Sequence, residues 1–253
     1  MIQSLLVAFA MYSKIPVPRV DWNEKNMRYA LCFFPWVGMV IGILVFFLGD
    51  LLFTAGIGKL CFSVVMTLLP LFLTGGIHMD GFLDTIDAIH SYGDKEKKQQ
   101  ILKDPNCGAF AVLFGGAYLL LTVAVWSECT REMLPFIGVT YSISRTLSAF
   151  SMAAFPLARN TGLVAAFQNG AKRKTVMVVM ICYFVMELLL LTIWNPWMMA
   201  AVLAAFLVAF LYHYHLCSKE FGGISGDLAG YFLQVAELLS MIAVCIAGKV
   251  VLA

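Results

Sequence analysis

Residues 64–94 read VVMTLLPLFLTGGIHMDGFLDTIDAIHSYGD and set a strongly apolar segment directly against a group of carboxylates. The four aspartates Asp80, Asp84, Asp87 and Asp94 follow the apolar run within a single short stretch of chain. A carboxylate beside hydrocarbon costs free energy unless a partner compensates its charge. The stretch therefore raises two questions: what fold surrounds it, and what the carboxylates bind.

The composition of the whole chain answers the first question. Of its 253 residues, 61% are hydrophobic and only 13% are charged, whereas soluble domains carry about 25% charged residues. This deficit is typical of polytopic membrane proteins. The net charge of +2 is too small to indicate a nucleic-acid-binding protein.

We expect an all-α, polytopic integral membrane helix bundle that forms one domain over residues 1–253, with about seven transmembrane helices. A membrane span needs about 20 apolar residues. Runs of this kind lie near residues 31–53, 57–77, 108–127, 133–155, 175–193, 196–214 and 229–252. The N-terminal run is shorter, ends at Pro16 and Pro18, and is predicted to be a helix lying at the membrane interface.

The distribution of basic residues predicts the orientation. Cytoplasmic loops of membrane proteins are enriched in lysine and arginine. One set of polar segments holds Lys14, Arg19, Lys25, Arg28, Lys95, Lys97, Lys98, Lys103, Arg159, Lys172, Arg173, Lys174 and Lys219. The opposite side holds only Lys59, Arg131 and Lys249. The N-terminus and all the polar clusters are therefore predicted to be cytoplasmic, and the C-terminus to be outside.

Three of the aspartates share one face of a predicted helix. Asp80, Asp84 and Asp87 are spaced i, i+4 and i+7, which places them within about 60° of one another. Like charges at this spacing destabilise a helix, and no lysine stands among them before Lys95. The pattern favours a cation site, and an all-oxygen ligand set suits Mg²⁺. The alternative is an acidic interfacial loop in which Asp80 or Asp84 caps a helix.

Two histidines and a lysine flank these aspartates. His78 and His90 lie off the aspartate face, which favours substrate contact or packing over metal ligation. Lys103 precedes a turn at residues 105–108 and is a candidate for binding a phosphate. A solvated lysine is the alternative.

The last polar segment joins a glycine-rich loop to the predicted final span. Gly222, Gly223 and Ser225 precede Asp227 at the start of that span. A glycine-rich loop followed by a helix N-terminus is a phosphate-binding arrangement. A carboxylate there would repel a bare anion, so Asp227 is better explained by a metal ion.

Two ionisable residues are predicted at membrane depth. Glu237 lies ten residues beyond Asp227, about 15 Å along a helix, and is too far away to share one ion with it. Arg145 is its candidate partner. Ionisable side chains at this depth are functional candidates, and both residues are kept as candidates for substrate contact. For Arg145 three uses are open: a salt bridge to Glu237, contact with a substrate phosphate, or snorkelling of its stem toward the membrane surface. A structural salt bridge between them is the alternative.

Several segments together resemble one known enzyme family. They are TGGIHMDGFLDTIDAIHSYGD (74–94), LKDPNCGAFAVL (102–113) and GGISGDLAGYFLQVAELL (222–239). Over essentially its full length the chain is similar to cobalamin synthase, the adenosylcobinamide-GDP ribazoletransferase family. SKIPVP (13–18), FPWVGMVIG (34–42) and SRTLSAFSMAAFPLAR (144–159) support the match. The chain departs from the family pattern at Ala88, where glycine is common, and at Ser225, where threonine is usual.

The resemblance implies a Mg²⁺-dependent enzyme of the bacterial inner membrane. It would join adenosylcobinamide-GDP to α-ribazole or α-ribazole 5′-phosphate and release GMP, a late step of cobalamin (vitamin B12) biosynthesis. Asp80, Asp84 and Asp87 match the family's first acidic motif and Asp227 its second. These four are expected to hold the metal ion and to be catalytic.

Phosphoryl transfer of this kind depends on positioning and on neutralising charge. The residues expected to bind substrate are Lys103, Arg145, Arg159, Gly222, Gly223, Ser225 and Glu237. His78 and Asp87 are alternative general bases. A homo-oligomer, or a complex with other cobalamin-pathway enzymes, is left open.

Two other function classes fit the composition less well. A CDP-alcohol phosphotransferase also uses clustered aspartates and Mg²⁺, but this chain lacks the arginine and later aspartate pair at the spacing that such enzymes need. A secondary transporter predicts related halves and charges near the bilayer midplane, and no repeat is found. The segment HYHLC (213–217) offers metal-ligating side chains, but its spacing does not bring all of them to one helix face.

Overall fold

The protein is helical throughout the part of the chain that the structure describes. The structure is a computed structural model, and it describes residues 1–158, 165, 167–168 and 172–252. The main helices are α1 (Ile2–Tyr12), α2 (Glu24–Met27), α3 (Phe34–Thr54), α4 (Lys59–Thr74), α5 (Ile77–His90), α6 (Lys95–Ile101), α7 (Ala109–Ser127), α8 (Leu134–Ala154), α10 (Arg173–Trp194), α11 (Pro196–His215) and α12 (Gly226–Val251). Short helical turns are η1 (Ala30–Phe33), η2 (Arg131–Met133) and η3 (Leu216–Glu220), the last a π-helix. The all-α prediction is confirmed.

The helices form a multi-pass membrane bundle. Within the described residues, five helices are long and apolar enough to cross a membrane, or six if α4 and α5 count as one bent span. The predicted number of about seven is therefore approximate. The difference lies partly in α8, which has 21 residues but carries buried polar side chains along its length. Because α8 is enclosed by other helices, its polar groups contact protein instead of lipid.

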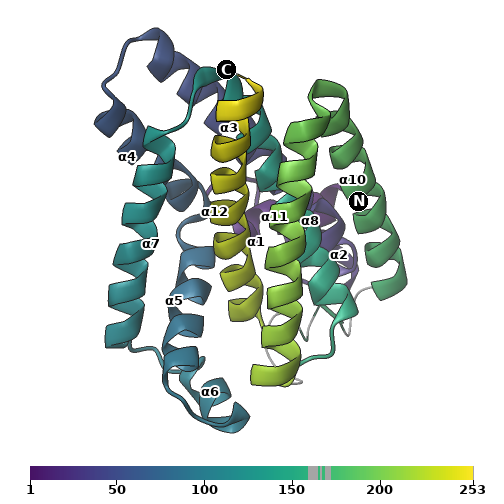
Figure 1. The fold of residues 1–253 in the computed structure, drawn as a ribbon. Coiled ribbons are helices and arrows are strands. Elements are labelled where there is room, and N and C mark those ends of the chain that lie inside the picture. The colour runs from purple at the N-terminus through teal and green to yellow at the C-terminus, as the bar shows by residue number, and fades with distance from the viewer. Residues whose placement is uncertain (159–164, 166, 169–171, 253) are drawn as a thin grey trace.

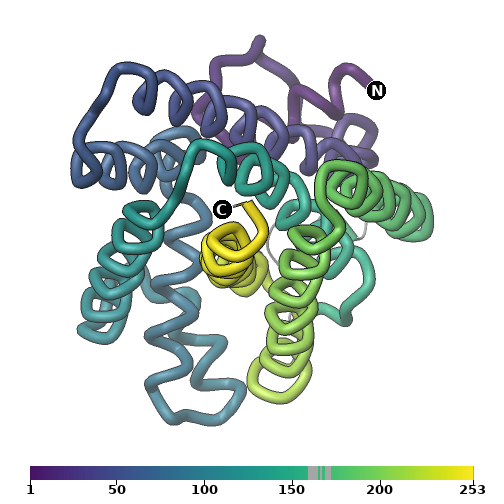
Figure 2. The backbone as a smooth tube through the Cα atoms, turned by 45° about the horizontal axis from the view of Figure 1, so that its top comes forward, coloured from purple at the N-terminus to yellow at the C-terminus, as the bar shows by residue number. Residues whose placement is uncertain are grey.

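Helix α12 lies at the centre of the bundle. Figure 2 shows it surrounded by α5, α7, α8 and α11, all of which it contacts. In Figure 1, α5, α7, α11 and α12 run side by side between the two ends of the molecule. Residues on α12 consequently face several other helices at once.

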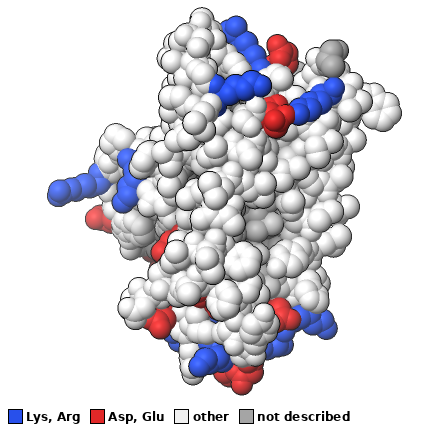
Figure 3. Space-filling model, turned by 60° about the vertical axis from the view of Figure 1, so that its left-hand side comes forward, with Lys and Arg blue, Asp and Glu red and all other residues white. Residues whose placement is uncertain are grey.

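Most charged side chains lie at the ends of the bundle. Figure 3 shows them at the top and bottom with a broad, largely uncharged band between, and a smaller group to one side. Arg131, beyond the end of α7, pairs with Asp50 at 2.5 Å. At the opposite end, Lys98 of α6 pairs with Glu220. An apolar band between charged ends is the surface expected of a protein in a bilayer.

Helices α3 and α8 touch through their backbones. A Cβ atom on Gly42 would overlap the backbone carbonyl of Gly138, and one on Gly138 would lie 3.0 Å from the carbonyl oxygen of Gly42. Gly38, one turn earlier, has the same relation to Tyr141. Small residues at this spacing allow membrane helices to approach closely. The glycines of the FPWVGMVIG segment therefore position α8.

The chain turns sharply between α4 and α5. Gly75 and Gly76 have φ angles of 65° and 79°, in the left-handed region that glycine adopts without steric cost, and the two helix axes differ by 96°. The apolar run predicted near residues 57–77 thus ends at Thr74, and the aspartates lie on a separate helix. The turn directs α5 along α7 and α12.

The N-terminal helix is short, as predicted. It ends at Tyr12, before Pro16, and one side of it, including Val7 and Met11, is buried. Its position in the membrane interface stays a prediction. Tyr12 lies in the wall of the cavity described below.

The α3–α8 contact generates a test of the packing. Gly42→Ala should lower the unfolding midpoint in detergent, because overpacking a close contact costs about 1–3 kcal/mol. Gly116→Ala on α7 is the matched control, since a Cβ atom there meets nothing within 4 Å. It should keep or raise the midpoint, because alanine favours a helix over glycine by about 1 kcal/mol. Equal midpoints for the two variants would contradict the proposed contact.

Candidate active site

Helix α5 brings three aspartates close to a fourth from α12. Asp80, Asp84 and Asp87 lie on α5, and Asp227 lies in the first turn of α12. The negative charges of Asp80, Asp227 and Asp87 all act on the carboxyl group of Asp84. These four residues, here called the acidic cluster, therefore lie near one another. Within the described residues, neither Asp80 nor Asp84 forms an ion pair with lysine or arginine.

Two glycines allow α5 and α12 to meet at the acidic cluster. A Cβ atom on Gly81 would lie 2.8 Å from the backbone oxygen of Asp227. A Cβ atom on Gly230 would lie 3.2 Å from the backbone oxygen of His78. Both distances are too short for a larger residue without displacement. The glycine after Asp80 thus has a packing role that brings the two acidic motifs together.

A cavity of about 210 Å³ lies beside the acidic cluster. Side chains from α1, α3, α5, α8 and α12 contribute to its walls. The polar residues that line it include His78, Asp80, Ser148, Ser225 and Asp227. The aromatic and apolar residues include Tyr12, Phe34, Met152 and Leu233. The cavity thus joins residues from segments far apart in the sequence.

Two buried polar atoms in the cavity wall lack partners. Nε2 of His78 and Oγ of Ser148 have no hydrogen-bond partner among the described residues, although the two side chains are buried. The His78 ring lies 6.2 Å from the ring centre of Tyr12 and 5.9 Å from that of Phe34. Buried polar atoms are nearly always hydrogen-bonded. Two such atoms in one cavity indicate a place for a ligand.

Asp87 has a structural role that the sequence analysis missed. One carboxylate oxygen accepts a hydrogen bond from the backbone N–H of Gly108 at 2.6 Å, and the other accepts from that of Ala111 at 2.9 Å. Asp87 therefore caps α7 from a neighbouring helix. Gly108 leaves room for it, because a Cβ atom there would lie 2.6 Å from the carboxylate. The only signal in the sequence was the glycine before an apolar run.

The acidic cluster does not form a closed metal cage. Among the residues that the structure describes, no three His, Cys, Asp or Glu side chains converge to hold a metal ion. The prediction that Asp80, Asp84, Asp87 and Asp227 bind metal stays a prediction. Proteins usually hold Mg²⁺ with one or two carboxylates together with water and substrate phosphates, and the oxygens of this cluster fit that mode.

The glycine-rich segment is held against a neighbouring strand-like segment. The backbone N–H of Ala158 donates to the carbonyl of Ile224 at 3.0 Å, and Gly223 packs against the same segment. Ser225 caps α12, since its Oγ accepts from the N–H of Leu228 at 3.2 Å. Ser225 lines the cavity, whereas Gly222 is exposed outside it. Substrate binding by these residues stays a prediction.

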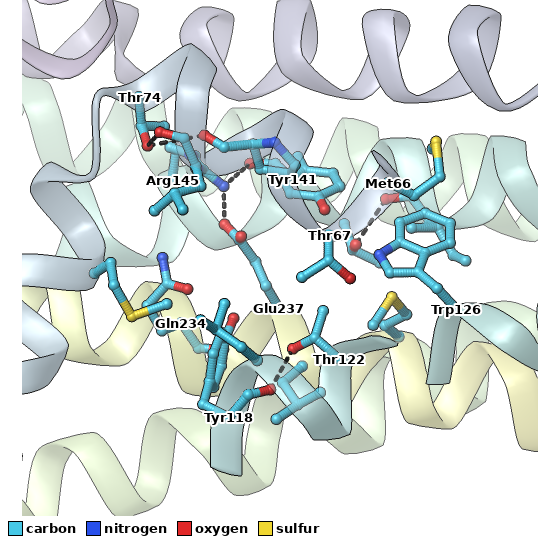
Figure 4. A pocket seen from close by; sticks show the side chains of 18 residues that line it. Met66, Thr67, Thr74, Tyr118, Thr122, Trp126, Tyr141, Arg145, Gln234 and Glu237 are labelled. Carbon is cyan, nitrogen blue, oxygen red and sulfur yellow. Dashed lines mark hydrogen bonds and ion pairs between the residues drawn. The ribbon is translucent and has the colours of Figure 1, made fainter. Parts of the chain in front are cut away.

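Arg145 and Glu237 form a buried ion pair, which was the alternative to substrate binding. Figure 4 shows the two side chains pointing toward one another. Arg145 also donates to the hydroxyl of Ser144 at 2.8 Å, and Ser144 donates to Glu237 at 3.0 Å. The pair lines a separate small cavity of about 40 Å³. The arrangement supports a structural role, and substrate contact by either residue stays a prediction.

The remaining predicted residues are not gathered at the cavity. Lys103 is exposed between α6 and α7, and Arg159 lies outside the described residues. The neighbouring Asp104 accepts hydrogen bonds from the backbone and side-chain N–H groups of Asn106, which lower the pKa of its carboxyl below the ordinary value. His213 and Cys217 contact one another inside the bundle, and His213 also contacts Ser151.

Sequence reasoning also missed a second carboxyl within the membrane bundle. Glu187 of α10 is buried, and its Oε1 accepts from the hydroxyls of Ser142 at 2.5 Å and Thr146 at 3.1 Å. The available signal was a single acidic residue in the apolar run VMELLLL (185–191). Both hydroxyls belong to α8, so α8 binds carboxyl groups from α10 and from α12.

Comparisons with known proteins agree on one family. Residues 4–245 match the family described as Cobalamin-5-phosphate synthase. A protein of Lachnoclostridium phytofermentans named "Adenosylcobinamide-GDP ribazoletransferase" is 41% identical over 99% of this chain and 96% of its own length. Proteins with the same name from Clostridium botulinum and Geobacillus thermodenitrificans are 32% and 30% identical, over 96% and 92% of this chain and 97% and 92% of theirs. No solved structure matches the chain. The resemblance drawn from the motifs is confirmed.

Measurements of protein stability can distinguish the roles of Asp84 and Asp87. In detergent with EDTA, Asp87→Ala should destabilise the protein by about 1–2 kcal/mol, because α7 loses its capping acceptor. Asp84→Ala should keep or raise the unfolding midpoint, because it removes one of several repelling charges. Thermal unfolding of the two variants beside the wild type measures both effects. An equal loss in each variant would contradict the assignment.

The buried ion pair generates a second stability prediction. Glu237→Gln should cost about 3–5 kcal/mol, because it leaves the Arg145 charge buried without its partner. Glu187→Gln is the matched control, since its hydroxyl donors remain and no cation loses a partner; it should cost much less. Replacing both members of the pair, Arg145→Met with Glu237→Leu, should recover part of the loss. Unfolding midpoints in detergent give the comparison, and similar losses for the two glutamine variants would contradict it.

Proposed function

We propose that this chain, which belongs to the cobalamin-5-phosphate synthase family, joins adenosylcobinamide-GDP to α-ribazole with release of GMP. The relatives' shared name supports the reaction. The proposed location of the reaction rests on the cavity that Asp80, Asp227 and His78 line. Nε2 of His78 has no hydrogen-bond partner there among the described residues. The protein is a transferase of cobalamin biosynthesis in this proposal.

The proposed reaction is a phosphoryl transfer. A ribazole hydroxyl attacks the phosphorus atom bonded to the cobinamide, and a new oxygen–phosphorus bond forms. The bond between that phosphorus and the GMP oxygen breaks, and GMP leaves with the electron pair. α-Ribazole 5′-phosphate offers the same hydroxyl and would give the phosphorylated product. Catalysis of such a step depends on positioning and on neutralising phosphoryl charge.

Mg²⁺ is the metal ion that the acidic cluster fits. Asp80, Asp84 and Asp227 offer carboxylate oxygens, which Mg²⁺ prefers, and a divalent cation relieves the repulsion acting on Asp84. When bound, Mg²⁺ supplies charge neutralisation at the phosphoryl oxygens. Asp80 and Asp227, in the first turns of α5 and α12, and Asp84, further along α5, would hold the ion.

His78 is better placed than Asp87 to act as general base. Both oxygens of Asp87 accept hydrogen bonds from the start of α7, so it positions that helix. His78 offers a nitrogen without a partner among the described residues, on the same cavity wall as Asp80. A neutral histidine accepts a proton from a hydroxyl within hydrogen-bond reach. We assign the ribazole hydroxyl proton to Nε2 of His78.

The site is proposed to face the cytoplasm from the bacterial inner membrane. The lysines of α6 lie at the end of the bundle where α12 begins, and Figure 1 shows the C-terminus at the opposite end. Enrichment of basic residues in cytoplasmic segments favours this orientation. The N-terminus is then cytoplasmic and the C-terminus outside.

Purified protein in detergent tests the reaction and the metal site together. Given adenosylcobinamide-GDP and α-ribazole, the wild type should release GMP with Mg²⁺ and should stop when EDTA removes the metal. Asp84→Asn should lower the rate by about 10²–10³-fold, the loss typical when one transition-state electrostatic contact is removed. Chromatographic measurement of GMP and cobalamin gives both products.

Glu96→Gln is the matched control, because Glu96 is an exposed carboxylate on α6 outside the acidic cluster. It should retain the wild-type rate. GMP release that is unaffected by EDTA or by Asp84→Asn would overturn the metal site but not the reaction. Absence of GMP from well-folded wild type under all these conditions would overturn the reaction.

A further inference from the structure

The residues that line the cavity beside the acidic cluster differ in charge and in exposure. Its acidic residues are among the more accessible ones: Asp80 is exposed and Asp227 is half-buried. Phe34, Ser148 and Met152 are almost fully buried. The cavity therefore has an accessible acidic side and a buried side whose walls are aromatic, apolar or uncharged.

Ser148 is an exception among the described serine and threonine residues of α8. The others have hydrogen-bond partners. Thr140 and Ser151 donate to backbone carbonyls of their own helix, and Ser142 donates to Glu187. Ser144 and Thr146 each lie within hydrogen-bond distance of both a backbone carbonyl of α8 and a carboxyl group. Ser148 Oγ is buried and has no partner in the described part of the chain. A hydroxyl in a membrane helix normally bonds to its own backbone when no other partner is present. The free donor of Ser148 is therefore available to a bound molecule.

The buried side suits a flat, uncharged ring system with one hydrogen-bond acceptor. No lysine or arginine is among the described residues that line the cavity, and the apolar and uncharged side chains among them favour an uncharged group over a diphosphate. An apolar protein cavity of about 150 Å³ holds one benzene ring. At about 210 Å³, this cavity has room for a somewhat larger fused ring and not for a whole nucleotide.

We propose that the buried side of this cavity binds the benzimidazole ring of the ribazole acceptor, with the Ser148 hydroxyl donating a hydrogen bond to the ring nitrogen that is not bonded to ribose. This inference rests on the proposed function, which supplies the acceptor. That ring nitrogen has a lone pair and no hydrogen, so it accepts and cannot donate. The ring's methyl groups meet the apolar walls at Phe34, Met152 and Leu233.

This placement is consistent with the chemistry of the accessible side. A nucleoside that enters ring first leaves its ribose hydroxyls toward the mouth of the cavity. Asp80 and Asp227 line that part of the site, and the buried Nε2 of His78 lies in the wall of the same cavity. The two buried atoms then have different roles. The Ser148 hydroxyl donates a hydrogen bond to the ring nitrogen, and His78 Nε2 accepts the proton of the ribose hydroxyl.

The test compares KM values for the two substrates. Ser148→Ala should raise KM for α-ribazole by up to about tenfold, since a net hydrogen bond contributes up to about that factor, and should leave KM for adenosylcobinamide-GDP unchanged. Ser151→Ala is the matched control: it lies one turn away on α8, is equally buried, and does not line the cavity. It should change neither KM.

A second measurement uses only wild-type protein. The α-riboside of benzimidazole without its methyl groups should show a KM about tenfold or more higher, because each methyl lost from an apolar pocket weakens binding. A Ser148→Ala effect on adenosylcobinamide-GDP instead of α-ribazole would overturn the proposal. Equal KM values with and without the methyl groups would also overturn it. In both cases continued GMP release would leave the proposed function intact, whereas wild type that releases no GMP would refute that function itself.

Discussion

Two helices that carry carboxylates at the same level repel each other, yet α5 and α12 are in backbone contact beside the acidic cluster. The contact is made at Gly81 and Gly230, where a Cβ atom would lie within 3.2 Å of the facing backbone. Their packing, together with the turn at Gly75 and Gly76, holds the two acidic motifs in place against electrostatic repulsion. The cavity exists because these helices meet here while α8 and α1 close its other walls. A cation that binds the carboxylates removes the cost of this arrangement.

The interior of the bundle shows how polar groups are accommodated away from water. Helix α8 carries hydroxyls and one guanidinium, and carboxyl groups from both neighbours bind several of them: Glu237 binds Arg145 and Ser144, and Glu187 binds Ser142 and Thr146. Polar groups in a membrane protein must find partners within the protein. These networks link α8 to α10 and α12 and keep it enclosed. The polar side chains in these networks also explain why α8, despite its 21 residues, is not among the helices that are apolar enough to cross a membrane.

The site keeps features that cost stability. His78 and Ser148 are buried with polar atoms that have no partner in the described part of the chain, and Asp84 lies among like charges. Natural proteins tolerate such local conflicts mainly where function requires them. Asp87, by contrast, stabilises the start of α7. One sequence motif thus contains a carboxylate that caps a neighbouring helix beside others that are proposed to bind a cation, and its members should not be given one role by analogy.

Composition and local spacing by themselves determined the membrane class, the all-helical architecture and the shared face of Asp80, Asp84 and Asp87, because hydropathy and helical periodicity are properties of neighbouring residues. The motifs determined the family. Only the tertiary structure decided that α4 and α5 are separate helices, that Asp87 reaches Gly108, that Arg145 pairs with Glu237, and that Ser148 has no hydrogen-bond partner among the residues that the structure describes. Each of these depends on which side chains meet across distant segments. Packing between helices sets those contacts, and no local pattern along the chain specifies it.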